Sequence, residues 1–413
     1  MGGEGGRRLE GAAVNGTPAM LSNIWDDLYK LTMGQAAFRL YDGVDAHYRF
    51  IDRGGTEFPS GFADELRRRV NWLPNVAMSA RERAFLEQIG SPRPFLRPAY
   101  IDWLYGYRYN PGEVEITQDG GRVDIDVRGP WYRTIRWEVK LMAMLVELYN
   151  EMMGREPAGD WPGRAAEKAR RLREAGARFA DFGTRRAFNG AVHERVLREL
   201  QIEAGDFLVG TSNLYLAMLL ELVPIGTKAH EWFKAHACMF GVRDATNRAL
   251  QAWTDEFGAN LGIALTDTFT TEVFLRNFGP YFAKLYDGVR HDSGCPFAFA
   301  DRIIKHYGSL RIDPATKTIV FSDGLDVDEA LRILDHCRDR IRVSFGIGTH
   351  FTNDVGHPAM NIVIKLWSMT IRNHCGERTI HATKLSDDIG KSTGEPEARD
   401  HALYELGLSA SSG

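Results

Sequence analysis

Polar residues that could bind anions or transfer protons recur where apolar runs of this sequence stop. Between about Arg178 and Trp367, eight strand-like runs each end in glycine, serine, threonine or a charged residue, and a helix-compatible segment follows. In an α/β barrel the strands end at one mouth, where the chemistry takes place. The pattern therefore predicts that the following residues converge on one site: Arg185, Ser212, His230, Asp267, Arg290, Asp292, Asp323, Gly346 and Gly348.

One of these segments, SFGIGTHFTND, has the composition of a phosphate-binding loop. Gly346 and Gly348 would let backbone N–H groups approach an anion, and Thr349 would add a hydroxyl donor. Barrels often hold phosphate in the loops after their seventh and eighth strands. A glycine turn that needs positive φ is the alternative, and the sequence does not choose between the two.

Charged residues at other run ends suit a phosphorylated sugar. Arg290 and Asp292, in RHDSG, offer a fixed cation and a carboxylate. Asp267 in LTDTF and Asp323 in FSDG could hold ribose hydroxyls or the water ligands of Mg²⁺. Each also has a structural alternative, either an Arg–Asp pair at the barrel rim or a helix cap. Taken together, they favour a polyhydroxylated, phosphorylated substrate.

His230, in GTKAHEW, stands beside Glu231. An imidazole at a barrel mouth can act as a base, a ligand or a nucleophile towards phosphorus, although a lone histidine is more often only hydrogen-bonded. His236 follows six residues later, so the two rings do not share a helix face and a metal pair is not expected. The later GKS sequence lacks the preceding glycine of a P-loop.

The elements that would position these residues form an irregular eight-stranded α/β barrel beside an N-terminal α/β domain. We expect a disordered leader over residues 1–20, the N-terminal domain over 21–150, the barrel over 151–370, and a segment over 371–413 that packs back on the N-terminal domain. A helix is expected from about residue 22 to 41, and a hairpin around residues 119–121. The expected barrel strands lie in RFADFGT, FLVGTSN, LVPIGTKAHEW, LGIALTD, YDGVRHDSG, TIVFSDG, IRVSFGIGTH and NIVIKLW.

Composition excludes several classes of protein. With 413 residues and a net charge of −4, the chain lacks the basic excess that duplex nucleic acid requires. No uncharged apolar run approaches the length of a membrane helix. The four cysteines form no CxxC pair, so neither a zinc site nor a disulfide framework is expected. A reducing cytoplasm is the expected compartment.

Nine short motifs in order, from about Ser22 to Ser392, resemble the nicotinate phosphoribosyltransferase family. They are WDDLYKLTMGQAAF, DFGTRRAF, LVGTSNLYLA, GTKAHEW, LTDTF, RHDSG, FSDGLD, FGIGTHFTND and KLSDDIGKS. The resemblance implies a type II phosphoribosyltransferase-like barrel that makes nicotinate mononucleotide and pyrophosphate from nicotinate and phosphoribosyl pyrophosphate. It also implies ATP as co-substrate, Mg²⁺, a place in NAD biosynthesis, and a homodimer with shared active sites.

The resemblance further implies roles for individual residues. His230 matches the histidine that ATP transiently phosphorylates. Phe182 and Tyr29 match the aromatic pair that encloses the pyridine ring, and Asp27 and Tyr29 are expected from the partner subunit. Ordinary core packing and helix capping are the alternatives for these residues.

Other matches concern the anionic groups of the substrates. Arg185 and Arg290 match cations that meet the carboxylate and the phosphates, and Asp267 and Asp292 match groups near ribose and Mg²⁺. The 5′-phosphate loop corresponds to Gly346, Gly348 and Thr349.

Ser212 bears on substrate choice. Relatives that use nicotinamide carry Asp at this place, and a carboxylate there would repel nicotinate, so Ser212 favours the acid. Arg186 could replace Arg185 as the carboxylate contact. Two other functions stay open, a nicotinamide phosphoribosyltransferase and a barrel lyase or aldolase acting on a sugar phosphate, for which Lys365 would be the Schiff-base lysine.

Overall fold

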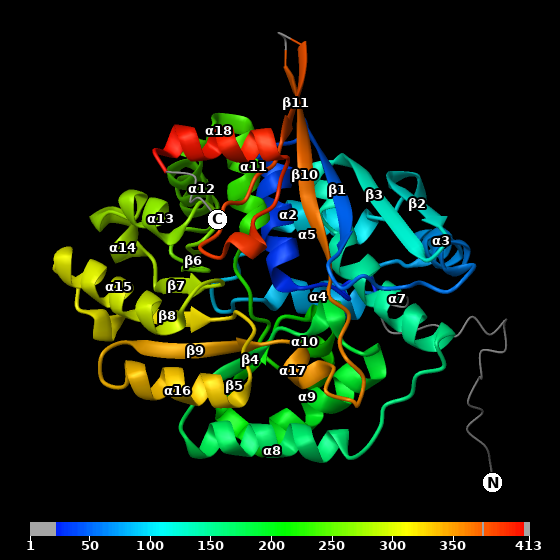
Figure 1. The fold of residues 1–413 in the computed structure, drawn as a ribbon, viewed down its shortest axis with the longest axis horizontal. Coiled ribbons are helices and arrows are strands. Elements are labelled where there is room, and N and C mark those ends of the chain that lie inside the picture. The colour runs from blue at the N-terminus through cyan, green and yellow to red at the C-terminus, as the bar shows by residue number, and fades with distance from the viewer. Residues whose placement is uncertain (1–21, 374–375, 409–413) are drawn as a thin grey trace.

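The computed structural model describes residues 22–373 and 376–408, so the predicted leader lies outside the described residues. Two sheets organise the chain, one antiparallel and one parallel (Figure 1). The mixed α/β class with a separate N-terminal sheet agrees with the prediction. Within the described ranges, no helix is both long enough and apolar enough to cross a membrane.

The antiparallel sheet has the strand order β11-β10-β1-β3-β2. The predicted hairpin is confirmed, because β2 and β3 pair directly across a turn in which Gly120 has φ of +56°. Strands β10 and β11 come from the far end of the chain, and β10 pairs along β1 (Figure 1). The strands of this sheet are β1 (Val44–Asp52), β2 (Val114–Asp119), β3 (Arg122–Pro130), β10 (Ile362–Asn373) and β11 (Gly376–His381).

The parallel sheet has the strand order β5-β4-β9-β8-β7-β6. All its pairings are parallel, so the carboxyl ends of the six strands meet at one edge. That edge is where the predicted site residues follow their strands. The strands are β4 (Phe179–Asp181), β5 (Leu208–Thr211), β6 (Ile263–Leu265), β7 (Gly288–His291), β8 (Thr318–Phe321) and β9 (Arg342–Ile347).

Two of the eight expected barrel strands are not members of the parallel sheet. The LVPIG segment makes only an isolated bridge to β5, between Thr211 and Pro224, through the Val223 carbonyl and the Ile225 N–H. Because proline has no N–H, Pro224 cannot donate to a strand on the opposite side. The NIVIKLW segment became β10, whose side chains alternate between buried and half-buried from Ile362 to Trp367. Such alternation is typical of a strand with one covered face, whereas parallel barrel strands are buried on both faces. The domain boundaries at residues 150 and 370 stay predictions.

Helices cover both sheets. The predicted first helix is α2, and the two helices before β4 are α7 and α8. Helix α7 is buried from Trp137 to Asn150 and packs against α3, β10 and the turn after β4, so it links the two sheets. The helices are α2 (Leu28–Leu40), α3 (Phe62–Trp72), α4 (Ala80–Gln88), α5 (Pro98–Gly106), α6 (Trp131–Thr134), α7 (Trp137–Met152), α8 (Trp161–Glu174), α9 (Gly190–Ala204), α10 (Leu214–Leu220), α11 (His230–Phe240), α12 (Val242–Phe257), α13 (Thr271–Asn277), α14 (Pro280–Leu285), α15 (Pro296–Ser309), α16 (Val327–Cys337), α17 (Thr349–Thr352) and α18 (Pro396–Leu406).

Candidate active site

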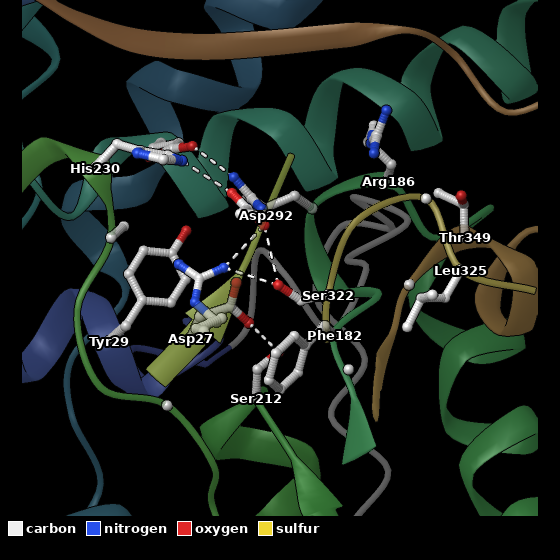
Figure 2. Close-up of a pocket in the computed structure, with 18 of the residues that line it drawn as sticks. Asp27, Tyr29, Phe182, Arg186, Ser212, His230, Asp292, Ser322, Leu325 and Thr349 are labelled. Carbon is white, nitrogen blue, oxygen red and sulfur yellow. Dashed lines mark hydrogen bonds and ion pairs between the residues drawn. The ribbon is translucent and has the colours of Figure 1, made fainter. Parts of the chain in front are cut away.

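The carboxyl ends of the parallel strands open into a cavity of about 700 Å³ (Figure 2). The loops after β4, β5, β7 and β9 supply part of its wall, and the starts of α2 and α11 supply another part. Eleven of the predicted site residues line it: Asp27, Tyr29, Phe182, Arg185, Ser212, His230, Arg290, Asp292, Gly346, Gly348 and Thr349.

His230 is the first residue of α11, where its ring is free of the helix and reaches the cavity. Its Nδ1 lies 3.0 Å from the Thr268 hydroxyl, and its Nε2 lies 2.9 Å from Asp292 Oδ2 (Figure 2). Burial and the neighbouring Lys384 ammonium lower the pKa of His230 to about 4. The imidazole is therefore neutral near pH 7 and available as a nucleophile.

Asp292 is held on both carboxylate oxygens. Its Oδ1 accepts hydrogen bonds from Arg290 and from the Ser322 hydroxyl, each at 3.0 Å, while Oδ2 faces His230. Burial alone would raise the pKa of Asp292, but the Arg290 guanidinium keeps it well below its usual range. Asp292 is thus an ionised group beside a neutral ring.

Asp267 lies behind His230 and is not part of the cavity wall, because its side chain is 1% exposed. Its Oδ2 accepts a hydrogen bond from Ser293 at 2.7 Å and pairs with Lys384 at 3.0 Å. Its buried Oδ1 has no hydrogen-bond partner among the described residues and lies 3.7 Å from His230 Nε2. Together with Asp292 and His230, it forms a group whose ligand atoms all lie within 4.8 Å of one another.

Asp323 was predicted to bind substrate, but its position does not suit that role. It does not line the cavity, and its carboxylate pairs with Lys391. Ser322, the preceding residue, takes the position at the end of β8 that faces Asp292. Both residues follow β8, which ends at Phe321, and of the two Ser322 lines the cavity.

Phe182 and Tyr29 direct their rings into the same cavity (Figure 2). Gly346 lies directly against the Phe182 ring, since a Cβ at this position would come within 2.3 Å of the ring carbons. Its φ is not in the positive region, so the turn interpretation does not apply to it. Gly346 therefore makes room for an aromatic ring, which the phosphate-loop interpretation did not anticipate.

Asp27 and Ser212 meet beside these rings, where the Ser212 hydroxyl donates to Asp27 Oδ1 at 2.8 Å. Asp27 precedes α2 but makes no capping hydrogen bond with its side chain, so the capping alternative is wrong. Burial raises the pKa of Asp27 above its usual range. Asp27 and Tyr29 line the cavity from the same chain as Ser212. Their supply by a partner subunit in a dimer stays a prediction.

Two neighbouring arginines have different surroundings. Arg185 donates to Glu138 at 2.9 Å and lies over the Tyr29 ring at 5.9 Å. The Arg186 side chain has no hydrogen-bond or ion-pair partner within the described residues, and its backbone carbonyl accepts from Asn353, just after α17. Burial and the nearby Arg185 lower the pKa of Arg186 to about 10, so it remains a cation.

Several residues of this site escaped the sequence analysis. Glu138 of α7 binds both Arg185 and the buried Lys30, which in turn binds Glu231 at 2.5 Å. A charged residue within the apolar run WEVKLMAMLV was the available signal for Glu138. Lys384 is the first residue of the KLSDDIGKS motif, and no role was predicted for it from the sequence.

Comparisons with known proteins agree with this geometry. Residues 177–407 match the model of the nicotinate phosphoribosyltransferase (NAPRTase) family, and residues 24–146 match its N-terminal domain. The chain is 47% identical to a nicotinate phosphoribosyltransferase of Desulforapulum autotrophicum and 44% identical to one of Chromohalobacter salexigens, in each case over 94% of this chain and 99% of the relative. The crystal structure of the Porphyromonas gingivalis nicotinate phosphoribosyltransferase aligns with a TM-score of 0.90 at 39% identity, covering 94% of this chain and all of that one.

Proposed function

The chain belongs to the nicotinate phosphoribosyltransferase family, and we propose that it makes nicotinate mononucleotide and pyrophosphate from nicotinate and phosphoribosyl pyrophosphate. ATP would serve as co-substrate, and the product would enter NAD biosynthesis. One observation carries the proposal: a single cavity joins an aromatic pair with adjacent guanidinium groups to a neutral histidine beside a carboxylate.

The aromatic end suits a flat, anionic ring. A pyridine ring between Phe182 and Tyr29 would gain apolar contact on its faces. Arg185 lies over Tyr29 and has donors beyond the one given to Glu138, so it is the better candidate for the nicotinate carboxylate. Arg186, next to the α17 segment that contains Thr349, would instead meet the 5′-phosphate of the sugar.

The histidine end suits phosphoryl transfer from ATP. His230 is neutral at pH 7, and a lone pair on Nε2 would attack the γ-phosphorus. Thr268 would hold the proton on Nδ1. A phosphoryl group on His230 would place negative charge at the cavity wall, where it could reorganise the binding of pyrophosphate.

Asp267 and Asp292 are the residues that would hold Mg²⁺. The buried, unpartnered Oδ1 of Asp267 supports this assignment, because an acceptor without a donor suits a cation or its water. Bound there, Mg²⁺ would neutralise phosphate charge. Arg290 and Ser322 would keep Asp292 oriented towards the site.

Chemistry at ribose requires no covalent nucleophile from the protein. As pyrophosphate leaves C1, positive charge develops on the sugar, and the pyridine nitrogen attacks from the opposite face. The chain would contribute position and charge, through the aromatic pair on one reagent and the guanidinium groups on both. A homodimer and a cytoplasmic location remain our expectations.

The test is a reaction with purified chain, nicotinate, phosphoribosyl pyrophosphate and Mg²⁺, with and without ATP. We expect nicotinate mononucleotide by mass spectrometry, formed faster with ATP, and little product when nicotinamide replaces nicotinate. Turnover of nicotinamide at an equal rate would contradict the choice of substrate. A borohydride-trapped sugar-phosphate adduct on Lys365 would instead support the lyase alternative.

A further inference from the structure

Lys384 lies against the atom of His230 that would react. Its Nζ is 3.0 Å from His230 Nε2 and 3.0 Å from Asp267 Oδ2. The Lys384 side chain is 9% exposed, so its ammonium reaches this position from inside the protein. Among the described residues, Lys384 is the only lysine or arginine whose side chain contacts His230 Nε2.

Lys384 begins a segment, residues 384–391, that crosses the carboxyl ends of the parallel strands; we call it the C-terminal strap. The strap is tied at several points to the loops beneath it. Its Leu385 N–H donates to the Thr268 carbonyl at 2.9 Å, and Thr271 N–H donates to Asp387 at 2.8 Å. At its far end Lys391 donates to the Asp292 carbonyl at 3.2 Å. These anchors hold Lys384 in place beside His230.

Nε2 of His230 has two hydrogen-bond partners with opposite requirements. Asp292 Oδ2, at 2.9 Å, favours a proton on Nε2, whereas the Lys384 ammonium favours a lone pair there. A neutral imidazole satisfies one of the two at a time. Only the form with the lone pair on Nε2 and the proton on Nδ1 can attack phosphorus through Nε2.

We propose that Lys384 is a catalytic residue of phosphoryl transfer to His230, an inference that rests on the proposed function. Its ammonium stabilises the imidazole form with the lone pair on Nε2. As the Nε2–P bond forms, the bond from the γ-phosphorus to the bridging oxygen breaks, and ADP leaves with that electron pair. The Nδ1 proton stays on the ring, bonded to Thr268.

The ammonium then exchanges its hydrogen bond to His230 for one to the phosphoryl group. Once Nε2 is bonded to phosphorus, it no longer accepts from Lys384, and the oxygens of the new phosphoryl group occupy the space next to Nζ. A charge-assisted hydrogen bond to those oxygens is stronger than one to a neutral nitrogen. Lys384 therefore stabilises the transition state and the phosphorylated enzyme more than the free enzyme, which is the requirement for catalysis.

The test compares two reactions of the full chain in three variants. The first is the rate of acid-labile label incorporation from γ-labelled ATP, and the second is turnover of nicotinate and phosphoribosyl pyrophosphate without ATP. Lys384→Met removes the ammonium and keeps the apolar stem, and Lys384→Arg keeps a cation. Lys391→Met is the matched control, because it loosens the same strap and leaves the charge beside His230.

We expect Lys384→Met to label about 100-fold more slowly, in line with the loss of one transition-state donor, with Lys384→Arg between it and the wild type. Turnover without ATP should fall by a much smaller factor than labelling, a residual loss being expected because Lys384 also pairs with Asp267. Lys391→Met should retain most of the labelling rate. Equal loss of both reactions in Lys384→Met, or equal loss of label in Lys391→Met, would make the effect structural and overturn the proposal. Unchanged labelling of Lys384→Met would overturn the role of Lys384 and leave the proposed phosphorylation of His230 standing. Absence of label on the wild-type chain would overturn both.

Discussion

The ring of Phe182 occupies the space that a side chain at residue 346 would need. A Cβ on Gly346 would lie 2.3 Å from two ring carbons, far inside van der Waals contact. Because Phe182 follows β4 and Gly346 lies in the adjacent β9, the contact joins neighbouring strands at the mouth of the cavity. The glycine thus sets the position of one of the two rings proposed to enclose nicotinate.

Gly346→Ala should therefore damage nicotinate binding more than phosphate binding. The added methyl must displace Phe182, and overpacking of this kind costs enough to raise the KM for nicotinate roughly tenfold. Steady-state kinetics with each substrate varied in turn would measure the effect. Since Gly348 would place its Cβ no nearer than 3.4 Å to Phe182, Gly348→Ala is the control. A larger rise for phosphoribosyl pyrophosphate in Gly346→Ala would restore the phosphate-loop interpretation.

Ser212→Asp should select against nicotinate. The new carboxylate would face Asp27, which Ser212 now contacts at 2.8 Å, and would repel the carboxylate of the substrate. Like charges brought together in an interface cost several kcal/mol, so a rise in KM of at least roughly tenfold is expected. Ser212→Ala adds no charge and should raise the KM only about threefold. The prediction fails if both variants bind nicotinate equally well.

Substitutions of the two adjacent arginines should differ in which substrate's KM rises and in whether the thermal unfolding midpoint falls. Arg185→Gln removes one of the two cationic partners of Glu138, so the thermal unfolding midpoint should fall and the KM for nicotinate should rise by roughly tenfold or more. Arg186→Gln breaks no ion pair among the described residues, so the midpoint should stay the same while the KM for phosphoribosyl pyrophosphate rises. Kinetics paired with thermal unfolding would show the reverse pattern if the assignments are exchanged.

Phosphorylation of His230 should be insensitive to mild acid. Burial and the Lys384 ammonium lower its pKa from 6.5 to about 4, so the imidazole stays neutral and nucleophilic as the pH falls from 8 to 6. Protonation would compete only as the pH approaches 4. Single-turnover labelling with γ-labelled ATP across this range would measure it. A loss of rate with a midpoint near 6.5 would indicate a ring exposed to solvent.

Lys365 should be an unusually reactive amine. Burial lowers its pKa to about 7, so a large fraction is neutral at pH 8, whereas an ordinary lysine is almost fully charged there. Pyridoxal phosphate followed by borohydride should label Lys365 at pH 8, and phosphoribosyl pyrophosphate should protect it, because the residue lines the cavity. Peptide mapping would locate the adduct. Labelling confined to surface lysines, with no protection by substrate, would place this amine out of reach.

Sequence patterns were most successful in predicting the site residues that directly follow strands. Asp292 and Ser212 were found because polar residues that follow apolar runs must meet at one edge of a parallel sheet. His230 was found by the same pattern, although the apolar run before it forms only an isolated bridge to that sheet. Asp323 shows the limit of that argument, since Ser322, the first residue after β8, lines the cavity instead.

Contacts between segments far apart in the chain were beyond the reach of local patterns. The sequence of β10 has the same apolar character as a strand of the parallel sheet. Its pairing with β1 places it, and with it Lys365, in the antiparallel sheet instead. Lys384 comes from a segment without periodicity, and its place beside His230 depends on hydrogen bonds to loops more than 100 residues earlier. Neither arrangement has a short-range signal, because tertiary packing decides it.

The most direct test of the account is to map the label after one incubation of the chain with nicotinate, phosphoribosyl pyrophosphate, Mg²⁺ and γ-labelled ATP. We predict nicotinate mononucleotide in solution and one acid-labile phosphoryl group, located by mass spectrometry on His230. The same incubation with His230→Gln should lose the label and the stimulation by ATP while retaining slow product formation. ATP-stimulated synthesis in that variant, or label on another residue of the wild-type chain, would contradict the account.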